Sequence, residues 1–240
     1  MQPDSHGVTI QACKHCGAGA PSDAHFCPKC DKILSFVRHG DYFTFLGLPR
    51  KLQVDLADLD QRLRTLSRQF HPDFYYNSTP SERLASLERA SYLNDAYRTL
   101  HDPAARIEYL LEIEGVAPKR RNEAAAGAGA AGVSAALLEE VYELNEELDA
   151  IREAREAGAP EADTRARLEA ARRPIDHHLA EHDRRRAELV ARWDALVDRN
   201  APPSERRPVL EALKALLLEK NYVNNLLAAI QKEAGEQEQA

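Results

Sequence analysis

The sequence predicts an all-α protein, formed by a helical hairpin and a C-terminal three-helix bundle behind a small cysteine-rich module. Three observations support this fold class. The 240 residues are 43% hydrophobic and 30% charged, with only 11 Gly and 13 Pro, a balance typical of helical proteins. Apolar residues recur every three or four positions over long segments, whereas the alternation typical of strands is scarce. All four cysteines lie within the first 30 residues.

Composition divides the chain into four segments. Residues 1–36 are short and loop-like and contain the cysteines. Residues 41–116 carry four helical patterns. Residues 117–133 include the low-complexity run KRRNEAAAGAGAAG and are expected to form a flexible linker. Residues 134–236 are expected to form the three-helix bundle.

The second segment predicts a hairpin of two long helices. A short helix over 42–46 precedes it, and a further helix over about 104–114 follows it. Asp55 is the expected N-cap of the first long helix, and Thr79-Pro80-Ser81-Glu82 is a capping box that starts the second. The expected buried stripes are Leu56, Leu59, Leu63, Leu66 and Phe70, then Ala90, Leu93, Tyr97 and Leu100.

The bundle segment predicts three helices, which are separated at Gly158–Pro160 and at Asn200–Pro203. The central helix, over 162–199, contains Pro174, which predicts a kink or a break. The last helix is expected over 204–234. The buried stripe of the first helix is Leu137, Val141, Leu144, Leu148 and Ile151.

The cysteines form two Cys-x-x-Cys pairs, CKHC at 13–16 and CPKC at 27–30. Four thiolates complete a tetrahedron, which suits one structural Zn²⁺ ion bound by Cys13, Cys16, Cys27 and Cys30. A rubredoxin-like iron site and two disulfides are the alternatives. His15 and His25 are interpreted as exposed loop residues, and Gly17 as the residue that permits a tight turn.

The tripeptide His71-Pro72-Asp73 ends the first long helix at the tip of the hairpin. It could be a plain turn in which Pro72 stops the helix and Asp73 caps the loop. It could also be a catalytic pair, although no nucleophile or phosphate-binding loop accompanies it. As a third possibility, it is a recognition tip. Arg62, Arg64 and Arg68 on the preceding helix then form a positive patch for an acidic partner.

These neighbouring segments resemble a known family. DYFTFLGL, RQFHPDF and LNDAYRTLHDPAARIEYLL together resemble the J-domain, and more narrowly the HscB family of iron–sulfur co-chaperones. The resemblance resumes at LLEEVYELNEELDAIRE and near KNYVNNLLAAI. It implies a J-protein without bond chemistry of its own, which stimulates the ATPase of a DnaK/HscA-type heat-shock chaperone. By this resemblance, His71, Pro72 and Asp73 contact the chaperone, and Arg62, Arg64 and Arg68 lie against its acidic face.

The resemblance further implies that the bundle binds the iron–sulfur cluster scaffold protein, of the IscU type. Leu138 and Tyr142 lie one position round from the core stripe, so they are expected to form an exposed apolar strip rather than peripheral core. The proposed scaffold-binding residues are Leu138, Glu139, Tyr142, Glu143, Glu146 and Tyr222.

Other classes of function are less well supported. A net charge of −7 argues against nucleic-acid binding, and no apolar run is long enough for a membrane span. The N-terminal sequence lacks the pattern of a targeting leader, which predicts a cytoplasmic protein. A general J-protein that delivers unfolded clients is the runner-up, and a metal-dependent enzyme is the third alternative. Self-association is left open.

Overall fold

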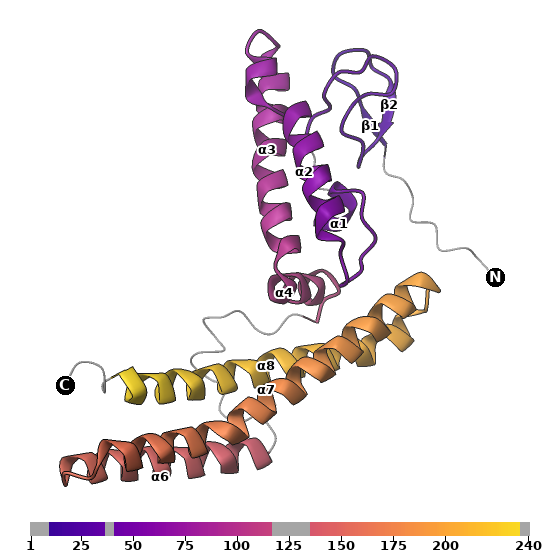
Figure 1. Cartoon of the computed structure of the whole chain (residues 1–240). Coiled ribbons are helices and arrows are strands. Elements are labelled where there is room, and N and C mark those ends of the chain that lie inside the picture. Colours follow the sequence, from indigo (N-terminus) through magenta and orange to yellow (C-terminus); the bar gives the residue numbers. More distant parts are fainter. Residues whose placement is uncertain (1–9, 37–40, 117–134, 236–240) are drawn as a thin grey trace. The chain divides into compact units, whose positions relative to one another are not determined.

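A computed structural model describes residues 10–36, 41–116 and 135–235, in two compact units, Met1–Ile113 and Glu114–Ala240. Helices make up most of both units, which confirms the predicted all-α class (Figure 1). Among the described residues, no helix has the length and apolar character needed to cross a membrane. The predicted linker, 117–133, lies outside the described residues.

The N-terminal part of the first unit contains a two-stranded antiparallel sheet. Strand β1, Ile10–Ala12, pairs with β2, Gly19–Pro21, so that Ile10 lies opposite Pro21. Cys13, Ala20, Cys27 and Leu34 form a small buried cluster beneath the strands. So small a cluster cannot stabilise a fold by burial alone, which makes the cysteines the main candidates to hold this segment together.

The predicted hairpin is present, and its ends carry the expected caps. Helix α1 covers Tyr42–Phe45, α2 covers Leu56–Gln69, α3 covers Pro80–His101, and α4 covers Pro103–Ile113. Asp55 caps α2, and Thr79 with Glu82 forms the capping box of α3. Gly47 closes α1 with a φ of +66°, a conformation that favours glycine.

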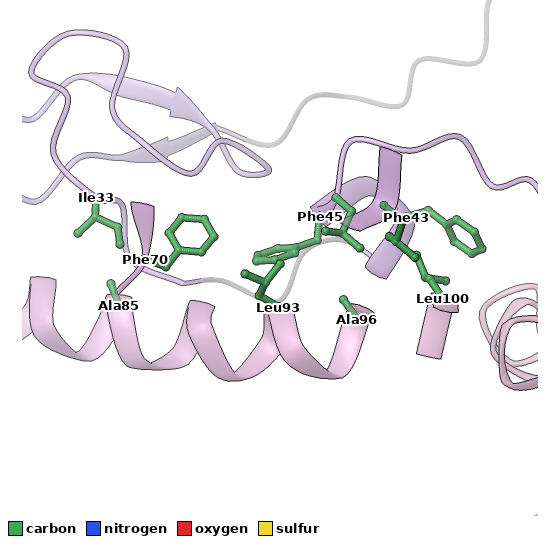
Figure 2. Close-up of a cluster of buried hydrophobic side chains, with 10 residues drawn as sticks. Ile33, Phe43, Phe45, Phe70, Ala85, Leu93, Ala96 and Leu100 are labelled. Atoms are coloured by element: carbon green, nitrogen blue, oxygen red, sulfur yellow. The ribbon is translucent and has the colours of Figure 1, made fainter. Parts of the chain in front are cut away.

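The core of the first unit lies between α1, α2 and α3. Its buried side chains include Phe43, Phe45, Leu59, Phe70, Leu93, Ala96 and Leu100. Figure 2 shows Ile33, from the cysteine-rich segment, beside Phe70 and Ala85 of the hairpin. The segment and the hairpin therefore share one core. The predicted burial of Leu56 is wrong, because it occupies the first position of α2 and is 44% exposed.

The second unit contains the three predicted helices: α6, Ala135–Glu156; α7, Glu161–Asp198; and α8, Pro203–Gly235. Gly158 and Asn200 adopt positive φ at the two turns. Of the predicted α6 stripe, Leu144, Leu148 and Ile151 are buried, whereas the side chains of Leu137 and Val141 lie outside the described residues.

Helix α7 is central to this unit, because it contacts both α6 and α8. The ring of His182 on α7 is buried, and its Nε2 lies 2.9 Å from the carbonyl oxygen of Leu216 on α8. Figure 1 shows α7 as one continuous helix that bends along its length. The predicted break at Pro174 is therefore wrong, and only the kink alternative agrees with the structure.

Candidate functional site

The four cysteine sulfurs lie within 4.8 Å of one another. Cys13 Sγ is 3.7 Å from Cys30 Sγ, and Cys16 Sγ is 3.7 Å from Cys27 Sγ. In a tetrahedral site with metal–sulfur distances of about 2.3 Å, neighbouring sulfurs are separated by about 3.8 Å. The thiols fit this arrangement, and all four are free. The residues can bind one metal ion, and the disulfide alternative does not describe this structure.

Two equivalent turns present these thiols. In the first, the Gly17 N–H donates to the Cys13 carbonyl; in the second, the Asp31 N–H donates to the Cys27 carbonyl, each at 2.9 Å. Gly17 has a φ of +71°, as its predicted role requires, and Asp31 has a φ of +54°. Aspartate tolerates this left-handed conformation better than most residues do, so the second turn needs no glycine.

Electrostatics of the thiols favour a shared cation. Backbone N–H groups of Cys16 and His15 lower the pKa of Cys13 to about 7. The Lys32 N–H favours the Cys30 thiolate, but burial and the other three cysteines raise the pKa of Cys30 to about 12. Four close thiols cannot all ionise unaided. A divalent ion removes this conflict, because it stabilises every thiolate.

His71-Pro72-Asp73 begins a short 3₁₀ helix, η1, Pro72–Tyr75, at the tip of the hairpin. The Asp73 N–H donates to His71 Nδ1 at 3.3 Å, so His71 rather than Asp73 is the cap, contrary to the plain-turn interpretation. An Nδ1 that accepts leaves the proton of the neutral ring on Nε2. The side chains of His71 and Asp73 are 50% and 87% exposed.

The three arginines of α2 differ in their surroundings. Arg62 pairs with Asp58 at 2.8 Å and donates to the carbonyls of Leu46 and Gly47 at 2.9 and 3.1 Å. Its guanidinium therefore ties α2 to the end of α1. Arg64 and Arg68 are exposed, and neither has an ion pair among the described residues.

On α6, the predicted apolar strip is described only in part. Tyr142 is 65% exposed, and Glu139, Glu143 and Glu146 are exposed beside it. The Glu146 carboxylate, as a hydrogen-bond partner, raises the pKa of Tyr142. The side chains of Leu138 and Tyr222 lie outside the described residues.

Sequence reasoning missed a buried polar cluster below the hairpin tip. Arg89 of α3 is 3% exposed and contacts His25 and several carbonyls of the cysteine-rich segment. His25 was expected to be exposed; instead its ring packs against Phe45 and Phe70, and its Nε2 lies 3.1 Å from the Phe45 carbonyl. Burial, reinforced by the Arg89 charge, lowers the pKa of His25 to about 4.

The chain is 35% identical over 129 residues to the co-chaperone protein HscB of Proteus mirabilis, a match that covers 54% of this chain and 70% of that protein. The chain belongs to the HscB family. Membership makes it a J-domain co-chaperone of iron–sulfur cluster assembly, with the four-cysteine module (described residues 10–36) in front of the J-domain hairpin. No protein-family model matches the chain.

A solved HscB structure shares this fold. The crystal structure of human co-chaperone protein HscB matches with a TM-score of 0.59 and 23% identity, over 93% of this chain and 98% of that chain. Chaperone HscB from Vibrio cholerae matches with a TM-score of 0.47 and 26% identity, over 78% of this chain and 98% of that chain.

Proposed function

We propose that this HscB protein stimulates the ATPase of a DnaK/HscA-type chaperone through His71, Pro72 and Asp73. The observation that carries the proposal is the exposed Asp73 carboxylate on a loop whose shape is fixed by its own backbone and ring contacts. A carboxylate held in this way can pair with an arginine in a charge-assisted contact. The loop then favours the hydrolysis-competent state of the chaperone and shifts an equilibrium in its partner without itself catalysing a reaction.

Arg64 and Arg68 dock against an acidic face of the same chaperone in this proposal. Both are exposed on the α2 half that adjoins the loop, so their attraction to the partner depends on salt. Arg62, the third arginine of the predicted patch, contributes mainly through the contacts that hold α1 and α2 together.

The second partner is the iron–sulfur scaffold protein of the IscU type. Its proposed surface is the strip around Leu138 and Tyr142 on α6, bordered by Glu139, Glu143 and Glu146, with Tyr222 of α8. An exposed tyrosine among carboxylates offers apolar area and hydrogen-bonding groups together, which is a common composition of binding surfaces.

Each remaining part of the chain has its own role in this proposal. The four-cysteine module, 1–36, holds one structural Zn²⁺ on Cys13, Cys16, Cys27 and Cys30; without an open coordination position the ion activates no water. Residues 41–116 form the J-domain, 117–133 the linker, and 134–236 the scaffold-binding bundle. The protein works in the cytoplasm and is not an enzyme.

Steady-state ATP hydrolysis tests the chaperone contact. Purified DnaK- and HscA-type chaperones of the source organism are assayed with this protein, with and without the scaffold. We expect stimulation that the scaffold increases further and that His71→Gln abolishes. Stimulation of neither chaperone would exclude the proposal, and stimulation that only unfolded clients enhance would favour the general J-protein.

Scaffold affinity, measured by calorimetry, tests the α6 surface. Tyr142→Ala is expected to weaken scaffold binding roughly tenfold, because it removes a large exposed side chain at the centre of the strip. Tyr76→Ala is the matched control, since Tyr76 is 79% exposed but lies in the other unit. Equal scaffold affinities of the two variants would remove the assignment.

A further inference from the structure

Arg89 of α3 connects the four-cysteine module to the base of the His71–Asp73 loop. Its Nη2 donates to the carbonyls of Leu34, Ala24 and Ser35, at 3.3, 3.4 and 3.5 Å. Its Nη1 lies 3.4 Å from His25 Nδ1. Among the described residues, the hydrogen-bond partners of this buried guanidinium therefore all belong to the module, and none to the hairpin.

The same guanidinium also contacts the rings that support the loop. Its Cζ lies 5.8 Å from the ring centroid of Phe70 and 5.3 Å from that of Phe36. Phe70 is the C-cap residue of α2, immediately before His71, and is completely buried. The module covers it as well, because the ring of His25 packs edge-on against it and that of Phe26 stacks on it.

The backbone of Phe70 is fixed from α3. The Ser86 hydroxyl donates to the Phe70 carbonyl at 2.6 Å, and Ser86 is completely buried one turn before Arg89. Apart from its contacts with the module, the loop is held mostly by short-range hydrogen bonds within itself, such as the bond from the Phe74 N–H to the His71 carbonyl. The rings of the module thus supply much of the packing that determines where the loop begins.

A buried cation needs compensating acceptors, since an isolated charge is costly to remove from water. Carbonyls of the folded module provide that compensation for Arg89. If the module loses its fold, these acceptors are lost and water reaches the guanidinium, so Phe70 loses its cover at the same time. The metal centre and the loop are then coupled through one residue.

We infer that Arg89 is a positioning residue that couples metal occupancy of the four-cysteine module to the order of the His71–Asp73 loop, and so to chaperone stimulation. The last step rests on the proposed function of the loop. The coupling itself concerns only this chain. It is reciprocal: metal binding favours the ordered loop by the same factor by which the ordered loop favours metal binding.

Hydrogen exchange of the full-length, zinc-loaded protein tests the coupling without any chaperone. The amides of Phe70, Phe74 and Tyr76 report on the loop, and those of α4, in the same unit, serve as an internal control for unfolding of that whole unit. In Arg89→Ala we expect loop exchange to rise roughly tenfold, and zinc affinity, measured by chelator competition, to fall by a similar factor. Arg98→Ala, an exposed arginine on the same helix, should change neither.

The metal-free variant Cys30→Ser completes the test. Its loop exchange should rise at least as much as that of Arg89→Ala, while α4 stays protected. Arg89→Lys keeps the charge but not the planar fork, and should fall between the wild type and Arg89→Ala. Faster loop exchange in Arg89→Ala but not in Cys30→Ser would make Arg89 a local packing residue and overturn the coupling. Unchanged exchange in both variants would overturn it as well.

These results stay distinct from those on the proposed function. If loop exchange responds as expected while His71→Gln still stimulates the chaperone fully, the coupling stands and the role of the loop fails. If His71→Gln abolishes stimulation while exchange does not respond to the metal, the role of the loop stands and the coupling fails.

Discussion

Arg89 in α3 and Arg106 in α4 are both buried, but the two residues are held by different parts of the chain. At the α4 end, Arg106 donates to the carbonyls of Leu100, Leu52 and His101, all within the J-domain hairpin. At the loop end, the acceptors of Arg89 come from the four-cysteine module, at 3.3 Å or longer, and its Nε has no hydrogen-bond partner among the described residues. The acceptors of Arg106 therefore belong to the same domain as Arg106 itself. The acceptors of Arg89 belong to a segment whose fold, in our proposal, needs a metal ion.

Metal removal should distinguish the surroundings of Arg89 and Arg106 most strongly, because metal binding supplies most of the folding free energy of so small a module. With the metal stripped by a chelator, we expect trypsin to cleave after Lys14 and Lys29 within the module, while Arg106 stays protected. Mass spectrometry of the fragments is the measurement, and the zinc-loaded protein is the control. Equal resistance with and without metal would mean that the module folds unaided.

Replacement of Arg89 or Arg106 by alanine should give the next largest difference between the two sites. Arg106→Ala removes the donor from the buried bonds to the Leu100 and Leu52 carbonyls, so we expect a loss of unfolding free energy of about 3 kcal/mol or more, against about 1–2 kcal/mol for Arg89→Ala. Urea titrations measure both. In a Cys30→Ser background Arg89→Ala should have little further effect, whereas Arg106→Ala should keep its full effect. A similar loss of unfolding free energy for Arg89→Ala in both backgrounds would contradict the claim that Arg89 depends on the four-cysteine module.

The three arginines of α2 should show a smaller difference, between a residue that stabilises the fold and residues that bind a partner. Arg62→Ala should destabilise the first unit by about 1 kcal/mol, because it removes bonds to the carbonyls that end α1. Arg64→Ala with Arg68→Ala should leave stability unchanged and weaken chaperone binding in a salt-dependent manner. Chaperone affinity at two salt concentrations, with urea stability alongside, separates the effects. A stability loss in the double variant would show that those two charges serve the fold.

Periodicity and caps were sufficient to predict the helices, and cysteine spacing was sufficient to predict four thiols that lie close enough to bind one metal ion. Asp55, Thr79 and Glu82 act locally, so their roles follow from short sequence patterns. Arg89 could not be recognised in this way, because an arginine near the buried face of a charged helix is ordinary until its distant acceptors are known. His25 was misjudged for the same reason: its burial depends on Phe45 and Phe70, which are remote in sequence.

The Asp73 carboxylate provides the most direct test of the central claim that the loop acts on another protein's ATPase. Asp73→Asn removes the charge and keeps the shape, and at 87% exposure it should leave the fold intact. The measurement is single-turnover ATP hydrolysis by the DnaK/HscA-type chaperone, titrated with wild type and variant. We expect stimulation to fall at least about tenfold, as for a lost charge-assisted contact. Stimulation equal to that of the wild type would contradict the claim.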